Sequence, residues 1–506
     1  MPETVLKLSG ITKRFGALVA NDGIDLDLKK GEVVALLGEN GAGKTTLMNI
    51  LFGHYVADEG HIEAFGQPLP VGDPKAALQA GIGMVHQHFT LADNMSVFDN
   101  IVLGTQSPWS WRLDRRGATA RIRKLSADFG LAVDPAAQVS LLAVGERQRV
   151  EILKALYRDA RVLILDEPTA VLTPQETEAL FATLKLLVAE GLSIIFISHK
   201  LNEVMAVSDR VLVLRGGRLA GERRTSDTTR QELASLMVGQ EVRMPEPRPA
   251  SPGAPLLEFD NVSTGQRPGG SPLREVSFAL RAGAITGLAG VSGNGQGAIA
   301  AIIAGTERPV SGRIRVEGRQ IGDWSPRAAL SAGIARIPED RHAVGSIADM
   351  SVAENVVSER YRQEPFSRAG VVNWGEARRF AERLIADYDV KCPSPETRIR
   401  LLSGGNMQKL ILGRALDPDP IIILANQPTR GLDVGAVAYV HGKLLEARDR
   451  GAAILLISED LDEVLALSDS IIVAYQGRVS VPSSRGERSV AELGELMAGH
   501  GIGEAA

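Results

Sequence analysis

The chain has 506 residues, 44% of them hydrophobic, and this length predicts two or more domains because one hydrophobic core rarely extends so far. Its 56 basic and 61 acidic residues give a net charge of −5, which argues against a protein whose main task is to bind nucleic acid. With one cysteine, Cys392, a disulfide framework is excluded; we expect no signal peptide and no membrane span, so that any membrane attachment goes through a partner.

The first chemical motif lies between a predicted apolar strand at residues 33–37 and a predicted helix at residues 46–52. Residues 38–45 read GENGAGKT, which fits the phosphate-loop pattern G-x-x-x-x-G-K-[ST] in its required strand–loop–helix context. Glycines let backbone N–H groups surround phosphates, and the helix start adds favourable partial charge. Lys44 then reaches the β- and γ-phosphates, and the Thr45 hydroxyl is suited to Mg²⁺.

Two segments further along have simpler interpretations than the functions they suggest. His86 and His88 flank Gln87, but no third metal ligand stands at suitable spacing, so we expect a polar loop there. Residues 112–124 are basic with helical charge spacing and no interleaved aromatic residues. This pattern predicts an exposed helix and no nucleic-acid surface.

A second motif closes a predicted buried strand at residues 162–165. The run VLILDE places Asp166 and Glu167 at the strand's end. Alone this pattern is weak, but after a phosphate loop it predicts a nucleotide site. Asp166 is then suited to Mg²⁺, and Glu167 to orienting or deprotonating an attacking water.

The chain also repeats itself. Lys44 and Gln296 stand 296 − 44 = 252 residues apart, and so do Gln87 and Glu339. Further on the offset is 260, shared by three pairs: Ala143 and Ser403, Glu167 and Gln427, His199 and Glu459. An offset that steps once by eight predicts two homologous halves with one insertion.

The proline-rich residues 241–255 are predicted to link domains at residues 1–240 and 256–500. Each half opens with a short apolar strand, at residues 5–8 and 256–259, and continues as alternating strands and amphipathic helices. This alternation predicts an α/β fold with a largely parallel sheet.

These motifs resemble those of the ATP-binding cassette superfamily over nearly the whole chain. The family signature, LSGGQ, is matched by LSGGN at residues 402–406 and weakly by LAVGE at residues 142–146. Gln87 matches the glutamine loop, His199 the histidine switch, and Phe15 the residue that stacks on adenine. The resemblance implies tandem domains, each with a RecA-like, mostly parallel sheet, an antiparallel β subdomain and a helical signature subdomain.

In that family two cassettes face head to tail, and each ATP lies between the phosphate loop of one and the signature of the other. The resemblance implies an intramolecular pseudo-dimer with one complete site, catalysed by Lys44, Gln87, Glu167 and His199. Mg²⁺ would be held by Thr45, Gln87 and Asp166. The implied nucleotide-binding residues are Phe15, Gly38, Glu39, Asn40, Gly41, Ala42, Gly43, Lys44, Thr45, Thr46, Ser403, Gly404, Gly405 and Asn406.

The other composite site has lost its polar parts, so we expect it to be catalytically silent. No aromatic residue stands at residues 261–265, where a second adenine stack is expected. The second phosphate loop has Gln296 and Gly297, and Asn426 and Gln427 replace the acidic pair. Glu459 stands at the switch position, and Ala143 stands in the first signature. Because these losses fall on parts of both halves, they favour sites paired across the halves.

Two features near the second signature carry weaker expectations. Asp340 and Arg341, which follow Glu339, are expected to form a solvated ion pair. Asp433 in TRGLD resembles the family's loop that crosses the pseudo-twofold axis, whereas the first half has Thr173 there.

Fused cassettes with a silent second loop resemble the ATPases of simple-sugar and nucleoside importers, and phrases such as GMVHQHF and RIPEDR favour the purine-nucleoside branch. The resemblance implies two polytopic permease subunits, an extracytoplasmic solute-binding protein and a peripheral location on the cytoplasmic face of the inner membrane. A ribose- or galactose-type importer remains the alternative. A tandem translation or DNA-repair factor is disfavoured by the short linker, the net acidity and the absence of sustained heptads. An oxidoreductase is disfavoured because no G-x-G-x-x-G with a downstream acidic residue follows a strand.

Overall fold

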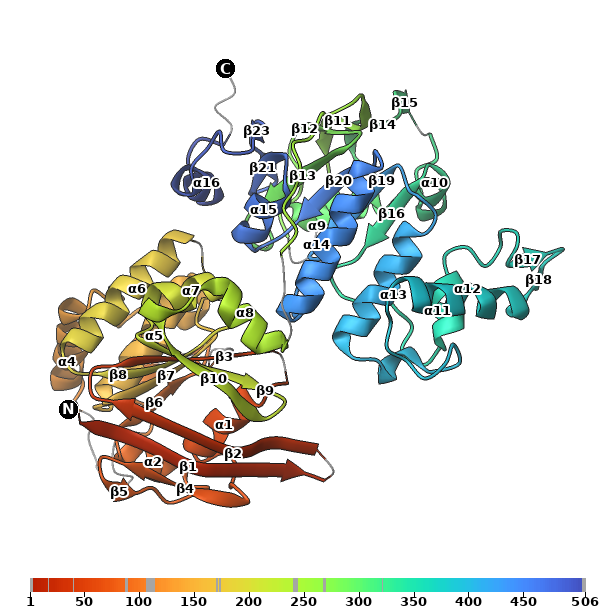
Figure 1. Ribbon diagram of the computed structural model, residues 1–506. Coiled ribbons are helices and arrows are strands. Elements are labelled where there is room, and N and C mark those ends of the chain that lie inside the picture. Colours follow the sequence, from red (N-terminus) through yellow and green to blue (C-terminus); the bar gives the residue numbers. More distant parts are fainter. Residues whose placement is uncertain are drawn as a thin grey trace. The chain divides into compact units, whose positions relative to one another are not determined.

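A computed structural model describes residues 3–16, 18–39, 41–86, 90–105, 114–169, 172, 174–239, 244–266, 270–320 and 322–502. The chain divides into two compact units, Met1–Val242 and Arg243–Ala506 (Figure 1). Both units combine a central, mostly parallel sheet with an antiparallel sheet and a group of helices. The predicted fold class is thereby confirmed.

The first unit opens with an antiparallel sheet in the order β2-β1-β4-β5. Its strands are β1 (Thr4–Phe15), β2 (Leu18–Lys29), β4 (Glu59–Ala64) and β5 (Gln67–Pro68). The central sheet has the order β10-β9-β3-β8-β7-β6, parallel throughout except for β10. Its strands are β3 (Val33–Gly38), β6 (Ile82–Val85), β7 (Val162–Asp166), β8 (Ser193–Ile197), β9 (Arg210–Arg215) and β10 (Arg218–Arg224).

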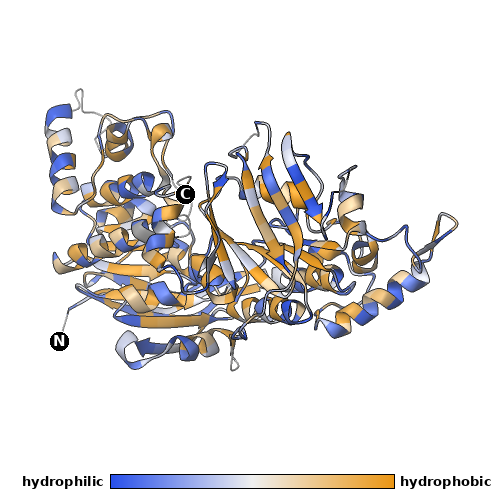
Figure 2. Cartoon of the chain, turned by 90° about the horizontal axis from the view of Figure 1, so that it is seen from above, coloured by the Kyte–Doolittle hydropathy of each residue, from blue (hydrophilic) through white to orange (hydrophobic). Residues whose placement is uncertain are grey.

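Alternate residues of the central strands enter two different hydrophobic cores, as expected for strands buried on both faces. In β7, Val162 and Ile164 pack toward the antiparallel sheet, whereas Leu163 and Leu165 pack toward the helical side. Figure 2 shows these central strands mostly in hydrophobic colours, while many helices carry both polar and apolar faces. The carboxyl ends of the buried strands therefore form a rigid edge for a site.

The helices of the first unit fall into two groups. The helices around the sheets are α1 (Lys44–Leu51), α2 (Pro74–Gln79), α6 (Pro174–Ala189), α7 (Leu201–Val207) and α8 (Arg230–Val238), with the 3₁₀ turn η2 (Thr225–Asp227). The helical subdomain contains α3 (Val97–Val102), α4 (Arg115–Asp128), the 3₁₀ turn η1 (Val139–Leu141) and α5 (Val144–Tyr157). The basic stretch predicted at residues 112–124 is helical from Arg115; residues 112 and 113 lie outside the described ranges.

The second unit repeats this plan, with an antiparallel sheet in the order β12-β11-β14-β15 and a central sheet in the order β16-β19-β20-β13-β21-β22. The first contains β11 (Pro255–Ser263), β12 (Val276–Arg281), β14 (Ser311–Val316) and β15 (Arg319–Gln320). The second contains β13 (Ala284–Ala289), β16 (Ile334–Ile337), β19 (Ile422–Asn426), β20 (Ala453–Ile457), β21 (Ser470–Tyr475) and β22 (Arg478–Val479), and β23 (Ser483–Ser484) pairs with β21.

The helices of the second unit also follow the first. Around the sheets they are α9 (Gln296–Ile303), α10 (Pro326–Ser331), α14 (Val434–Asp449), α15 (Leu461–Leu467) and α16 (Val490–Met497). The helical part contains α11 (Val352–Val357), the hairpin of β17 (Ser367–Arg368) and β18 (Val371–Val372), α12 (Trp374–Asp387), η3 (Ile399–Leu401) and α13 (Gly404–Leu416).

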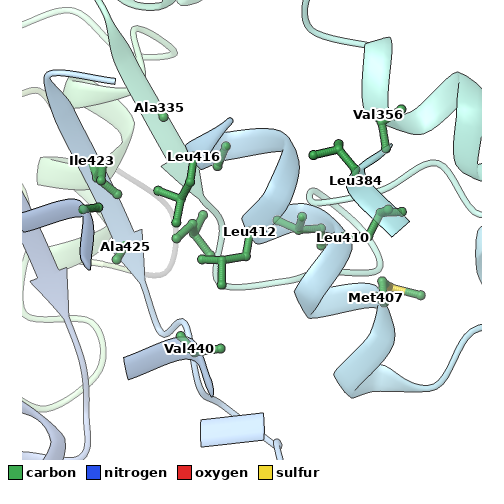
Figure 3. Packing of buried hydrophobic residues seen from close by; sticks show 14 of the residues in the cluster. Ala335, Val356, Leu384, Met407, Leu410, Leu412, Leu416, Ile423, Ala425 and Val440 are labelled. Atoms are coloured by element: carbon green, nitrogen blue, oxygen red, sulfur yellow. The ribbon is translucent and has the colours of Figure 1, made fainter. Parts of the chain in front are cut away.

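Helix α13, which begins at the LSGG sequence, is fixed from two sides. Figure 3 shows Leu412 and Leu416 among residues of the central sheet, including Ala335 and Ile423, while Leu410 lies toward the helical part. All of these side chains belong to one buried cluster. The signature at the start of α13 is therefore carried by a rigid element.

The expectation of a single eight-residue insertion is wrong, because the offset between the halves grows in three steps. The offset is 252 at the phosphate loops, 352 − 97 = 255 from α3 to α11, 374 − 115 = 259 from α4 to α12, and 399 − 139 = 260 from η1 to η3. The second step contains the β17–β18 hairpin. All three steps fall between elements, where added residues disturb no packed core.

Among the helices that the structure describes, none combines the length and apolarity needed to cross a membrane.

Candidate functional site

The phosphate loop of the first unit joins β3 to α1 as the sequence predicts. Gly41 and Gly43 have φ values of +83° and +99°, a backbone region that suits glycine. A Cβ on Gly43 would lie 2.3 Å from the carbonyl oxygen of Ala20, so no other residue fits without a backbone shift. Of the other predicted loop residues, Gly38 ends β3, Glu39 and Ala42 belong to this turn, Thr45 and Thr46 belong to the first turn of α1, and Asn40 lies outside the described residues.

Lys44 is buried, with 6% of the residue exposed. Its Nζ donates to the carbonyl oxygens of Gly38 (2.6 Å) and Glu39 (3.0 Å), which leaves one of its three N–H donors for a phosphate. Burial lowers the pKa of Lys44, against the opposing effect of the nearby carboxylates of Glu167 and Asp166. The structure thus brings the loop and the acidic pair together.

Asp166 ends β7 and is also buried, with 6% exposure. Burial and the neighbouring charge of Glu167 raise the pKa of Asp166 to about 6, with Lys44 acting in the opposite direction. The carboxylate of Asp166 and the hydroxyl of Thr45, an exposed residue directly after Lys44, are oxygen donors of the kind that fits Mg²⁺. The third predicted ligand, Gln87, lies outside the described residues.

Replacing Asp166 with asparagine is expected to stabilise the unliganded chain. A shift in pKa from 3.8 to about 6 implies that ionised Asp166 costs up to about 3 kcal/mol in the fold. The full gain is expected above pH 6, where the wild-type carboxyl is ionised. It shrinks as the pH falls toward 4, because there the folded wild-type chain takes up the proton that the unfolded chain still lacks. Urea unfolding of both proteins at pH 8 and pH 4.5 measures this difference, and a gain independent of pH would contradict the assigned burial effect.

Glu167 is fixed by its backbone and by His199. Its φ is +47°, and its N–H donates to the carbonyl oxygen of Ile197 at 2.9 Å. The Glu167 Oε1 and His199 Nδ1 atoms lie 2.8 Å apart. Burial alone would raise the pKa of Glu167, but the hydrogen bond and charge of His199, with Lys44 and Lys200, lower it overall. Glu167 is therefore ionised at neutral pH and able to accept a hydrogen bond from water.

Sequence reasoning missed the buried group beneath the histidine switch. Glu203 accepts hydrogen bonds from Thr169 (2.6 Å) and Ser198 (2.9 Å), and it pairs with Lys200 at 3.4 Å. This network ties the segment after β7 to the segment that carries His199. The feature that could have indicated this residue is a buried glutamate in the first turn of α7, but none of the motifs includes it.

Phe15 is 45% exposed and lies against Tyr55, a residue the motifs did not indicate; their ring centroids are 5.6 Å apart, edge to face. The two rings form an exposed aromatic surface at the end of β1 suited to stacking on a base. In the second unit, Glu307 stands at the position of Tyr55 (307 − 55 = 252), so the aromatic pair is confined to the first half.

Phe15→Ala is expected to weaken ATP binding without stopping turnover at saturating ATP. Loss of one base–aromatic stack costs about 1–2 kcal/mol, or about 5- to 30-fold in Kd. Binding of a fluorescent ATP analogue to the full chain measures the change. The matched control is Gln266→Ala, three residues beyond the end of β11 in the second half, which is expected to leave Kd unaltered; equal effects of the two variants would refute the assignment.

The second phosphate loop reproduces the backbone of the first with different chemistry. Gln296 replaces Lys44, and its Nε2 donates to the carbonyl oxygen of Val291 at 3.0 Å, the position of Glu39 in the first loop (291 − 39 = 252). The glutamine thus keeps the internal brace and loses the charge. The pocket around it includes Asn426, Gln427 and Glu459, and among the lining residues that the structure describes there is no lysine or arginine.

The acidic-pair position also keeps its backbone form in the second unit. Gln427 has a φ of +49°, and its N–H donates to the carbonyl oxygen of Ile457 at 2.8 Å, as Glu167 does to Ile197. Glu459 stands in place of His199, and its N–H donates to Gln427 Oε1 at 3.4 Å. The second unit therefore keeps the backbone geometry of the site but lacks the lysine and the acidic pair of the first unit.

The two signature turns differ in the group that caps the following helix. Ser403 caps α13, its Oγ accepting from the N–H (3.4 Å) and the Nδ2 (2.9 Å) of Asn406. In the first unit Ala143 has no hydroxyl, and the cap comes instead from Glu146, which accepts from the Ala143 N–H at 2.8 Å. Ser403, Gly404, Gly405 and Asn406 all belong to the second compact unit.

Comparison with known proteins places the chain among transport ATPases. The family described as ABC transporter matches residues 21–170 and 273–430. The guanosine import ATP-binding protein NupO of Bacillus subtilis (strain 168) is 46% identical over 98% of each chain. The nucleoside import ATP-binding protein NupA of Lactococcus lactis subsp. cremoris (strain MG1363) is 43% identical over 99% of each chain. The glucose import ATP-binding protein TsgD13 of Haloferax volcanii is 43% identical over 99% of this chain and 96% of its own.

Proposed function

This chain belongs to the ABC transporter family, and from that premise we propose that it hydrolyses ATP at a single competent site to energise import of a nucleoside. The observation that carries the proposal is the first unit's set of Lys44, Asp166, Glu167 and His199, which interact with one another directly or through charge. At the matching positions of the second unit stand Gln296, Asn426, Gln427 and Glu459.

The chemistry follows from the protonation states of these residues. Ionised Glu167 accepts a hydrogen bond from a water molecule, which attacks the γ-phosphorus while the bridging oxygen leaves with ADP, giving ADP and inorganic phosphate. His199 orients Glu167 through their 2.8 Å contact. Lys44 donates to the phosphates. Mg²⁺ bound by Thr45, Gln87 and Asp166 would neutralise phosphate charge during this step.

We propose that the second signature, Ser403 to Asn406, contacts the same ATP that the Lys44 loop binds. The substitutions at the other composite site, which include Gln296 and Ala143, support this pairing. Only pairing across the halves leaves one site with all of its functional residues. ATP then favours the closed pair of cassettes through contacts that the open pair lacks, and hydrolysis removes them. The fused chain would act as an intramolecular pseudo-dimer.

The partners we propose are two polytopic permease subunits and an extracytoplasmic solute-binding protein, with this chain peripheral on the cytoplasmic face of the inner membrane. The nucleoside assignment is supported by two relatives, 46% and 43% identical, that are named for guanosine and nucleoside import. A sugar remains the second candidate because a relative of 43% identity is named for glucose import.

The decisive experiment is reconstitution of the chain with its permease subunits and binding protein in vesicles. Guanosine is expected to stimulate ATP hydrolysis, and glucose or ribose is not. Stimulation by a sugar alone would overturn the nucleoside assignment and leave the importer intact. Association with ribosomes or RNA, without co-purification of a membrane protein, would overturn the importer itself.

A further inference from the structure

The segment after β16 contains an arginine that the mechanism above does not use. The expected solvated pair of Asp340 and Arg341 differs from what the structure shows: Asp340 Oδ1 accepts from the N–H groups of His342 (2.8 Å) and Ala343 (2.9 Å), and Glu339 pairs with Arg430. The backbone of Arg341 is fixed by Ser346, whose Oγ donates to its carbonyl oxygen at 2.8 Å.

The guanidinium of Arg341 lies between the two loops that the sequence assigns to the interface of the cassettes. Its Nη2 donates to the carbonyl oxygen of Arg430, in the TRGLD loop, at 2.8 Å. A methyl group placed on Gly404, the first glycine of LSGG, would lie 3.7 Å from its Cζ and its Nε. One placed on Gly431 would lie 3.0 Å from its Nη2. The side chain therefore connects the signature to the TRGLD loop.

This cation has no carboxylate in direct contact among the residues that the structure describes. Burial, opposed by Asp340 and assisted by Arg430, lowers the pKa of Arg341, as expected for a charge drawn partly out of water. A partly desolvated cation with no carboxylate in contact is costly. The start of α13, a helix of 13 residues, adds positive partial charge on the same side. An anion at this place would offset both.

The signature turn of the first unit has carboxylates close to its glycine. A Cβ on Gly145, the counterpart of Gly405 (405 − 145 = 260), would lie 2.4 Å from Glu176 Oε1. Glu146 supplies a second carboxylate at this turn through its hydrogen bond to Ala143. The position of Arg341 corresponds to Phe89 (341 − 252 = 89), an apolar residue. In the second unit a Cβ on Gly405 would lie 3.9 Å from Asp433 Oδ2, so its carboxylate is more distant, and Arg341 lies beside Gly404. The arginine at the first signature, Arg147, instead donates to the carbonyl oxygens of Leu142 and Ser140.

We propose that Arg341 donates a hydrogen bond to the terminal phosphate of the ATP held by the Lys44 loop when the second signature closes over it. The inference rests on the cross-paired site of the proposed function and adds a contact to it. Because ADP lacks the γ-phosphate, this contact distinguishes ATP from ADP. It also stabilises the charge that develops on the γ-phosphoryl oxygens as the bridging oxygen leaves.

The test uses the purified full-length chain with Arg341→Gln and Arg341→Lys. Arg341→Gln is expected to lower kcat by about 10²-fold, the typical effect of one lost transition-state donor. It should also weaken binding of a non-hydrolysable ATP analogue while ADP affinity stays within twofold. Arg341→Lys, which restores charge without the forked geometry, should recover part of the loss. The matched control is Glu176→Gln at the other signature turn, with turnover expected within twofold of wild type.

The outcomes separate this inference from the site on which it rests. If Arg341→Gln keeps wild-type turnover while Glu167→Gln and Ser403→Ala abolish it, the role of Arg341 is refuted and the proposed function stands. Equal losses of ATP and ADP affinity with a lower melting temperature would show that Arg341 only braces the Arg430 loop, which also refutes it. If Glu167→Gln itself leaves turnover intact, the proposed function fails.

Discussion

Glu167→Gln is expected to abolish steady-state ATP hydrolysis while leaving ATP bound. Glutamine retains the size and shape of glutamate but cannot take a proton from water, and a positioned general base contributes about 10²–10⁴-fold to rate. Because Glu167 is ionised and already oriented by His199 at 2.8 Å, the loss should approach the upper part of that range. The measurement is phosphate release under saturating Mg·ATP, together with retention of radiolabelled nucleotide after gel filtration.

The second half supplies the control for this result. Gln427 occupies the same strand end, with a φ of +49° against +47° for Glu167. Gln427→Ala should leave turnover within twofold, and Gln427→Glu should not create a second active site, because Gln296 and Asn426 still lack charge. A Gln427→Ala variant as inactive as Glu167→Gln would remove the asymmetry on which the mechanism depends.

Lys44→Gln is expected to reduce both ATP affinity and turnover, with kcat/KM lower by at least about 10²–10³-fold. The substitution copies the second loop, in which Gln296 makes the bond to Val291 that replaces the contact of Lys44 with Glu39. The internal brace of the loop is therefore preserved, and the loss reports on the positive charge alone. Steady-state kinetics and nucleotide titration of the full chain measure it.

Variants of Gln296, at the matching position of the second loop, are the controls for Lys44→Gln. Gln296→Ala should change turnover by less than twofold, since the described residues that line its pocket include no lysine or arginine to hold phosphate. Gln296→Lys should not restore a second site, because Glu459 and Asn426 remain. If Gln296→Ala and Lys44→Gln lost equal activity, both loops would be working sites and the single-site proposal would be wrong.

The sequence by itself determined the repeated α/β fold, the family and the imbalance between the halves. These rest on local patterns: GENGAGKT between a strand and a helix, an acidic pair at a strand end, and offsets of 252 and 260 residues. Such patterns persist because backbone geometry at a phosphate loop demands glycine at fixed positions and buried strands demand apolar runs. The predicted strands and helices accordingly lie within or beside the observed ones, with ends shifted by a residue or two at α1, β3 and β7.

Tertiary structure alone decided how these residues influence one another. Asp166 and Glu167 are equal in sequence terms, yet burial raises the pKa of the first to about 6 while His199 lowers that of the second. Arg341 reads as a surface residue, yet the fold places it beside Gly404, which lies 63 residues further along the chain (404 − 341). Burial and contacts between distant segments depend on how whole layers pack, and no short pattern encodes them.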